Sequence, residues 1–216
     1  MRRRPLLACS AAWPIWAAAD APSLVSAAEA GDMMALRRLL DAGAPVDARA
    51  ARRRTALLAA THANRIDAAR LLIERGADVN AKDEMQDSPF LYAGAHGRLE
   101  IMRMTLAAGA DLKSTNRYDG TALIPAAHHG HVETVRELMK TRFDVDHVNR
   151  LGWTALLEVI VLGDGGAAHT EIVRLLVAHG ASLQLADAQG MTPLAHAEQR
   201  GQRAIVEIMR RAGARP

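Results

Sequence analysis

The chain has 216 residues, of which 50% are hydrophobic but only 3% are aromatic. A single large core usually draws much of its buried area from aromatic rings, so this composition favours thin layers of small apolar side chains. Without the arginines at positions 2–4, the 27 basic residues fall to 24, which equals the number of acidic residues. A body with balanced charge offers no broad electrostatic surface to nucleic acid or to anionic membranes.

Residues 1–19 have the layout of a secretory signal peptide. Three arginines at positions 2–4 precede a mostly apolar stretch at 5–16, which is too short for a comfortable membrane span. The alanines at 17–19 supply the small residues of a cleavage site, and Asp20 follows them. We therefore expect residues 20–216 to be the mature protein, without a membrane span, in the bacterial periplasm.

Cys9 is the only cysteine, and it lies inside the predicted signal peptide. Cleavage would leave no thiol, which excludes a structural disulfide, a thiolate zinc site and a cysteine nucleophile together. Three alternatives stay open for this segment: a lipoprotein cleavage box ending at Cys9, a twin-arginine signal, and an amphipathic or buried first helix.

A repeat of 33 residues organises the rest of the chain. Short segments led by Thr or Ser begin at residues 55, 88, 121 and 154, and a fifth begins at 192 after a five-residue insertion near 163–168. A degenerate first unit begins near residue 22. Six units in register over 22–216 predict a solenoid of stacked units.

Each unit predicts two helices. The leading Thr or Ser is a typical N-cap, and a Gly or Asn nine residues later ends the first helix. Apolar residues at helical spacing follow, as in Val132, Val135 and Leu138. A second Gly ends this helix, and an extended finger such as residues 76–80 then turns back towards the next Thr.

Several of these segments resemble the ankyrin-repeat family: GADVN at 76–80, GTAL at 120–123, GMTPL at 190–194 and GHVETV at 130–135. The resemblance implies an all-α solenoid of about six helix-turn-helix units, stacked in an arc, with short β-hairpin fingers near a right angle to the helices. No unit can bury its apolar face alone, so stability must come from contacts between neighbours.

The chain also departs from the family pattern. Arg142 stands where the other units have Gly, which predicts a rearranged helix end because left-handed non-Gly residues are strained. Pro125 falls early in a first helix and is expected to distort it. The insertion near 163–168 is rich in Gly and predicts a projecting loop: a tolerated surface insertion, or a loop that contacts a partner, with too few oxygen ligands for calcium. The family usually has a His three places after the Thr, but here that position holds other residues: Leu58, Leu91, Ile124, Leu157 and Ala195. This replacement predicts that the polar link made by the His is lost.

No cluster of residues carries a convincing catalytic or metal site. His128, His129 and His131 could attract a metal, but no regularly spaced Asp, Glu or Cys completes the set. There is no Gly-rich loop between a strand and a helix for a nucleotide, and no spacing singles out a carboxylate pair or a triad. The sequence therefore predicts no enzyme and no cofactor. The basic run at 52–54 is either a solvated turn or one end of a docking surface for an acidic partner.

The resemblance implies that partners bind to the finger tips and the exposed ends of the first helices, on the concave face. Arg117 and Tyr118 lie on one finger, and Arg150 and Trp153 lie on the next; rings and arginines are the residue types that dominate binding energy. Trp153 could instead pack under its neighbouring finger. The predicted partner surface comprises Met85, His96, Arg117, Tyr118, His128, His129, Arg150 and Trp153.

These observations predict a monomeric, non-enzymatic protein–protein interaction scaffold in the bacterial envelope. Three alternatives are an immunity protein that neutralises a toxic effector, an accessory protein that supports a periplasmic enzyme, as in peroxide tolerance, and an exported effector that binds host proteins. Neighbouring genes and cell fractionation would discriminate among them.

Overall fold

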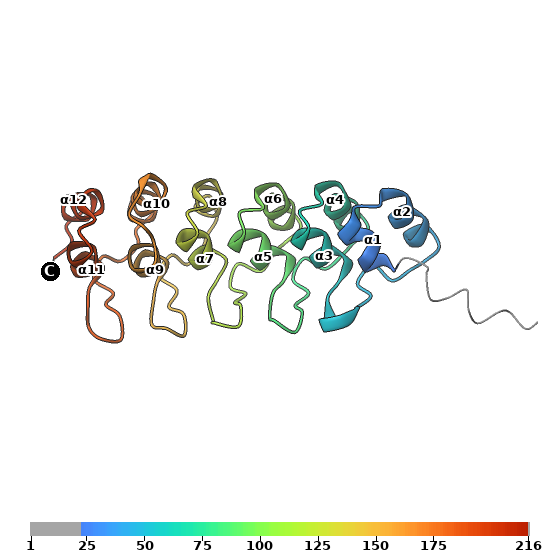
Figure 1. The fold of residues 1–216 in the computed structure, drawn as a ribbon, viewed down its shortest axis with the longest axis horizontal. Helices are drawn as coiled ribbons and strands as arrows, with labels where there is room; N and C mark the ends of the chain where they lie inside the picture. Colours follow the sequence, from blue (N-terminus) through green and yellow to red (C-terminus); the bar gives the residue numbers. More distant parts are fainter. Residues whose placement is uncertain (1–22, 216) are drawn as a thin grey trace, which may run out of the picture.

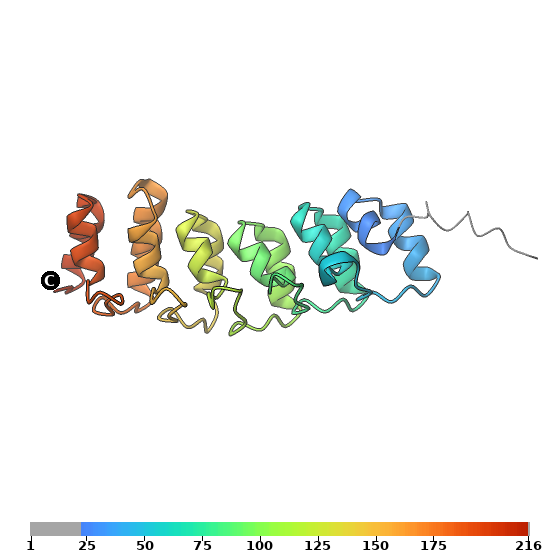
Figure 2. The ribbon, with the colours of Figure 1, turned by 60° about the horizontal axis from the view of Figure 1, so that its bottom comes forward.

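A computed structural model describes residues 23–215, where twelve α-helices form two parallel rows (Figure 1). The predicted all-α solenoid of about six helix-turn-helix units is confirmed. The connecting fingers project from one side of the inner row (Figure 2). The predicted signal peptide at 1–19 lies outside the described residues. The inner row comprises α1 (Leu24–Ala30), α3 (Ala56–His62), α5 (Pro89–Ala95), α7 (Leu123–His128), α9 (Ala155–Val161) and α11 (Pro193–Gln199).

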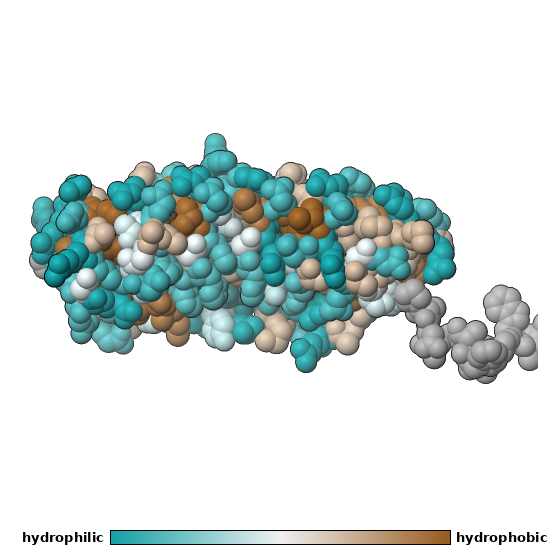
Figure 3. Space-filling view, turned by 45° about the horizontal axis from the view of Figure 1, so that its top comes forward, coloured by the Kyte–Doolittle hydropathy of each residue, from teal (hydrophilic) through white to brown (hydrophobic). Residues whose placement is uncertain are grey.

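The outer row forms the opposite side of the molecule, which is mainly hydrophilic with small scattered apolar spots (Figure 3). Its exposed charges pair with one another along the row: Arg103 Nη2 lies 3.1 Å from Glu137 Oε2, and Arg136 Nη2 lies 3.1 Å from Glu171 Oε1. This row comprises α2 (Met33–Asp41), α4 (Ile66–Glu74), α6 (Leu99–Ala107), α8 (Val132–Leu138), α10 (Ala167–Ala178) and α12 (Arg203–Arg211).

Four of the predicted N-caps start inner helices as expected. The hydroxyl oxygens of Thr55, Ser88, Thr154 and Thr192 each accept the backbone N–H three residues later, at 3.1 to 3.3 Å. Each bond satisfies one of the donors that the first turn of a helix leaves free. The repeated Thr or Ser therefore fixes where these helices begin.

The fourth unit differs from the other units at the start of its inner helix and at the end of its outer helix. Pro125 has no N–H to donate to the carbonyl of Thr121, so α7 begins later, at Leu123. The buried Thr121 hydroxyl consequently has no hydrogen-bond partner. Helix α8 has 7 residues, against 9 in α6, and Arg142 is not among the residues with positive φ. The helix end is rearranged, as expected where Gly is missing.

The prediction of a projecting loop at 163–168 is wrong. The connection between α9 and α10 is 162–166, two residues longer than the connection 63–65 in the second unit, and α10 then begins at Ala167 and runs for 12 residues, against 9 in α6. Asp164 Oδ1 accepts the N–H of Gly166 at 2.7 Å and lies 2.7 Å from His169 Nδ1. This carboxylate stabilises the turn, so the insertion lengthens the connection only slightly and otherwise lengthens the outer helix.

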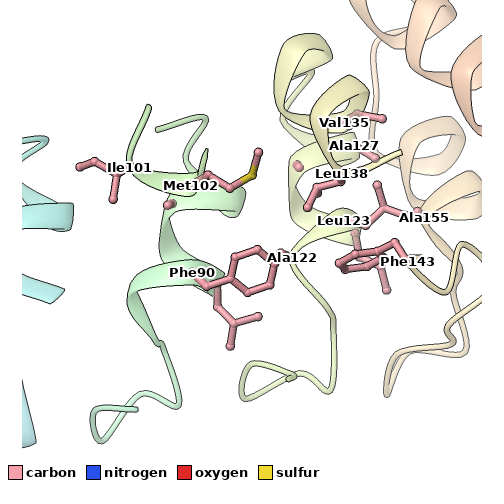
Figure 4. Packing of buried hydrophobic residues seen from close by; sticks show 14 of the residues in the cluster. Phe90, Ile101, Met102, Ala122, Leu123, Ala127, Val135, Leu138, Phe143 and Ala155 are labelled. Atoms are coloured by element: carbon pink, nitrogen blue, oxygen red, sulfur yellow. The ribbon is translucent and has the colours of Figure 1, made fainter. Parts of the chain in front are cut away.

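The core runs continuously through the stack, because each inner helix packs on the next. Phe90 is fully buried and lies beside Ala122 of the following unit, and Leu123 and Leu138 extend the same layer (Figure 4). The small Ala side chain leaves room for the ring between two closely spaced helices. Burial at the joints between units, rather than within them, stabilises the fold.

Side chains at one repeat position add polar bridges between units. Arg65 Nε donates to the carbonyl of Glu29 at 3.1 Å, and His169 Nε2 lies 2.9 Å from the carbonyl oxygen of His128. Each bridge satisfies a carbonyl at the end of the preceding inner helix, where no helical partner is available.

Candidate functional site

One polar residue shapes each of four fingers. Its Oδ1 accepts two backbone N–H groups of the finger tip at 2.8 to 3.1 Å, and it stands five residues before the N-cap: Asp83, Asn116, Asn149 and Asp187. Two backbone bonds close each turn, as from Asn149 N–H to the carbonyl of Trp153 and from Gly152 N–H to the carbonyl of Asn149, both at 3.0 Å. The fingers are thus hairpin turns, without a strand ladder anywhere in 23–215. Sequence reasoning missed these residues, although their spacing repeats that of the N-caps.

The turns present the same repeat position at the tips of three adjacent fingers. Met85, Tyr118 and Leu151 are 42%, 53% and 53% exposed there. The backbone N–H of Arg150 donates to the carbonyl of Tyr118 at 3.0 Å, which joins the last two of these fingers. Together the tips and the inner helices beneath them form what we call the finger face.

The two arginines predicted for this surface lie exposed beside the apolar tips. The guanidinium carbon of Arg117 lies 4.8 Å from the ring centre of Tyr118, within the range of a cation–π contact. Trp153 is half-buried, and its carbonyl closes the turn of its own finger. Tyr118, Arg117 and Arg150 therefore offer more accessible contact groups than Trp153 does.

A row of rings lies along the inner helices from the second unit to the fourth. His62 stacks on Tyr92 with ring centres 3.7 Å apart, and Tyr92 stacks on His96 at 4.0 Å. His96 and His129 follow at 6.4 Å, and His129 and His128 at 4.4 Å. Tyr92 joins the predicted His96 to His62, and neither Tyr92 nor His62 was part of the predicted surface.

Burial keeps several of these imidazoles uncharged. It lowers the pKa of His62 from 6.5 to about 4, and the positive charge of Arg54 adds to the effect. The pKa values of His96 and His128 are also lowered, first by burial and then by the neighbouring His129. At pH 7 these three side chains are therefore neutral rings that can accept a hydrogen bond.

A pocket of about 310 Å³ opens between the third and fourth fingers. Ile124 and Pro125 from α7 form apolar walls, and Tyr118 and Leu151 stand above them on the two fingers. Glu158 of α9 and His128 of α7 supply the main ionisable groups. The predicted residues His128, His129 and Tyr118 meet here, but Ile124, Leu151 and Glu158 were not predicted.

Glu158 is the buried polar group of this pocket, with only 8% of its surface exposed. Asn149 Nδ2 donates to its Oε2 at 2.9 Å, while His128 Nδ1 lies 3.7 Å from its Oε1. Burial raises the pKa of Glu158 from 4.5 to about 7. The pocket therefore combines apolar walls with a carboxyl group that is only partly ionised at neutral pH.

The contact between Glu158 and Asn149 also corrects the expectation that the polar link to the finger is absent. In the sixth unit the equivalent residues are again joined, since His196 Nε2 lies 2.7 Å from Asp187 Oδ2. Both linking residues stand four places after the N-cap, whereas the residue three places after it, such as Leu157, faces the core. The link is shifted by one residue in these two units.

The described residues show no arrangement of three or more His, Cys, Asp or Glu side chains that could hold a metal ion. None of the helices between 23 and 215 is long and apolar enough to cross a membrane. Met85 on the second finger and His96 in the third unit lie further along the finger face from the pocket. The arrangement is an open surface with a pocket between its third and fourth fingers, which suits binding.

Comparison with known proteins places this geometry among related repeats. A family model described as ankyrin repeats (3 copies) matches residues 19–83, 90–165 and 142–216. The solved structure of an ankyrin repeat domain from Acinetobacter baumannii AYE is 57% identical, with a TM-score of 0.87, over 89% of this chain and 98% of that one. The ankyrin repeat protein EF0377 is 39% identical, with a TM-score of 0.84, over 88% and 98% of the two chains.

One curated relative covers a shorter stretch. YahD of Escherichia coli (strain K12), described by its ankyrin repeats, is 50% identical over 58 residues, which are 27% of this chain and 29% of YahD. The chain therefore matches less than a third of the length of that relative.

Proposed function

Because the chain belongs to the ankyrin-repeat family, whose repeats generally mediate protein–protein interaction, we propose that it is a non-catalytic scaffold that holds a protein partner against its finger face. The main support for this proposal is the location of the exposed apolar side chains. Among the described residues, five of the seven exposed large hydrophobic side chains lie on the fingers: Met85, Tyr118, Val148, Leu151 and Leu185. Gathered apolar surface of this kind marks interaction sites.

The outer row supports the same choice of face. From α6 to α10 its arginines are already paired with carboxylates of the same or the next unit, as Arg103 is with Glu100 at 3.0 Å and with Glu137 at 3.1 Å. Exposed pairs of this kind contribute little energy and leave few unmatched charges for a partner. On the finger face, by contrast, Arg117 and Arg150 flank exposed apolar tips.

We expect the double change Arg117→Ala and Tyr118→Ala to weaken partner binding by about 2 kcal/mol or more, because truncated rings and arginines carry most of the energy in such interfaces. The partner is first captured from envelope extract with the wild-type chain and identified by mass spectrometry; affinities are then measured by calorimetry. The thermal melt should not change, since both side chains are exposed.

The matched control is Glu100→Ala with Arg103→Ala, which removes an exposed pair from the outer row. It should leave the affinity at the wild-type value. An unchanged affinity for the finger-face variant, or an equal loss in the control, would place the partner elsewhere.

We further propose that the protein acts in the periplasm. The support is the residue pattern at 1–19 and the confinement of cysteine to position 9. Protein isolated from a periplasmic extract should begin at Asp20, as read by N-terminal sequencing. Ala19→Leu, which enlarges the residue before the cut, should leave the precursor uncleaved. Recovery of an intact Met1 from the cytoplasmic fraction of wild-type cells would contradict this location.

A further inference from the structure

We propose that the pocket between the third and fourth fingers binds a tyrosine side chain that the protein partner presents on an extended, acidic segment. This inference rests on the proposed function, because it names what the partner inserts into the finger face. It is carried by the shape of the pocket, by a Glu158 oxygen that faces the pocket without a hydrogen bond, and by the charges on the two fingers.

The shape of the pocket suits one large apolar side chain. Its volume is about 310 Å³, and Ile124 and Pro125 form walls beneath the exposed tips Tyr118 and Leu151. A mostly apolar pocket with a few placed polar groups is typical of sites that select a single anchoring group. An aromatic ring would cover both finger tips and both walls at once.

The polar group in the pocket calls for a hydrogen-bond donor on that ring. Glu158 is 8% exposed, and Asn149 donates to its Oε2. Its Oε1 makes no hydrogen bond to any residue in 23–215, since His128 Nδ1 lies too far away, at 3.7 Å. Oε1 is open to the pocket, and a ring that fills the pocket would cover it. Because a buried acceptor without a partner is costly, a ligand that brings an O–H group to Oε1 avoids that cost.

The charges around the mouth favour a neutral donor over a cation. Arg117 and Arg150 stand on the two fingers, His128 and His129 line the α7 side, and Asp119 is the acidic residue at the tip of the third finger. A lysine or arginine entering here would approach two guanidinium groups. A phenol carries its donor without charge, and acidic residues beside it would meet Arg117 and Arg150.

The test uses the full chain, labelled with ¹⁵N and titrated in an NMR experiment with short synthetic peptides. The first peptide is Asp-Glu-Tyr-Glu-Asp with blocked ends. Three others change one feature each: Phe for the Tyr, Lys for the Tyr, and Lys for all four acidic residues. We expect the first to bind about tenfold more tightly than the Phe peptide, because only the phenol satisfies Glu158, and more tightly than the other two. The shifts should centre on Ile124, His128 and Leu151.

Three variants separate the contributions. Glu158→Met should abolish the difference between the Tyr and Phe peptides, with the fold checked by circular dichroism. Leu151→Ala removes an exposed finger-tip side chain that lines the pocket. It should weaken the binding of both peptides without affecting folding. Leu185→Ala, on the last finger and outside the pocket, should change neither affinity.

Equal binding of the Tyr and Phe peptides, a preference for the Lys peptide, or no shift at millimolar Tyr peptide would each overturn this inference. None of these results would alter capture of the natural partner, which tests the proposed function independently. A partner that binds the finger face while the peptides fail would show that the face is correct and that the occupant of the pocket is not tyrosine.

Discussion

Phe90→Ala is expected to lower the free energy of unfolding by about 3–5 kcal/mol, the range found when a fully buried Phe is truncated. Phe90 has none of its surface exposed, and it lies against Ala122 at the joint between the third and fourth units. Alanine at 122 cannot expand into the cavity, so most of the lost contact would remain unfilled. The effect should exceed that of any single finger substitution.

The position of Phe90 also predicts how unfolding changes. In a stack whose units contact only their neighbours, a weakened joint lets the two sides unfold separately. Urea denaturation followed by circular dichroism should therefore show a lower midpoint and a broader transition than the wild type. Met34→Ala, at a side chain that is 84% exposed on α2, is the control and should change stability by less than about 0.5 kcal/mol. A loss below about 1 kcal/mol at Phe90 would mean that the joint is held by other contacts.

The fold could be predicted from the sequence because its signals repeat. A single Thr before an apolar run is weak evidence for a helix start, but a Thr or Ser at the same repeat position, at 55, 88, 154 and 192, specifies one geometry several times over. Departures from the repeat pattern could also be predicted where a residue type has a known effect on the backbone. Pro125 lacks a donor and Arg142 avoids the left-handed conformation, and both changed the local helix as expected.

The insertion was wrongly predicted to project as a loop, because contacts with neighbouring residues, and not its own composition, decide its structure. Residues 163–166 read as a flexible loop, yet Asp164 bonds to Gly166 and His169 and turns the chain into α10. A contact between side chains five residues apart depends on where the following helix starts. That start could not be fixed from the spacing, because the insertion itself breaks the spacing.

The candidate site was only partly predictable, for a related reason. Fingers and first-helix ends follow from the repeat positions, so Tyr118, His128 and Arg150 could be named. Glu158 was not predicted, because its residue type gives no sign of burial, whereas the structure places it in the same pocket as Leu151, bonded to Asn149. The pocket exists because side chains from two units converge, and repeat position alone gives no distance between them.

Glu158 should also make stability depend on pH, and Glu158→Gln is expected to stabilise the protein above pH 7 by up to about 3 kcal/mol. The raised pKa, about 7 against 4.5, means that the folded state binds a proton that the unfolded state lacks between these values. Wild-type stability from this group is therefore full below pH 4.5 and is lost as pH rises through 7, at about 1.4 kcal/mol per pKa unit. Gln stays neutral, and its carbonyl can still accept from Asn149.

The imidazoles of the ring row make stability depend on pH in the opposite direction. Their effect must be separated from that of Glu158. Because the pKa of His62 is lowered from 6.5 to about 4, its contribution is full above pH 6.5 and is lost as pH falls towards 4. The wild type should thus show opposing trends between pH 4 and 7, and Glu158→Gln should retain only the loss at low pH.

Urea denaturation of wild type and Glu158→Gln at pH 4.5, 6, 7 and 8.5 would measure the difference directly, with Glu84→Gln at an exposed finger position as the matched control. The two curves should nearly coincide at pH 4.5, where the wild-type carboxyl is protonated in the folded state and half protonated in the unfolded state, and separate as pH rises through 7. The control should follow the wild type throughout. A constant offset at all pH values would instead mean that Gln changes packing, and coincident curves at pH 8.5 would mean that water reaches the carboxylate and the pocket is more open than its 8% exposure indicates.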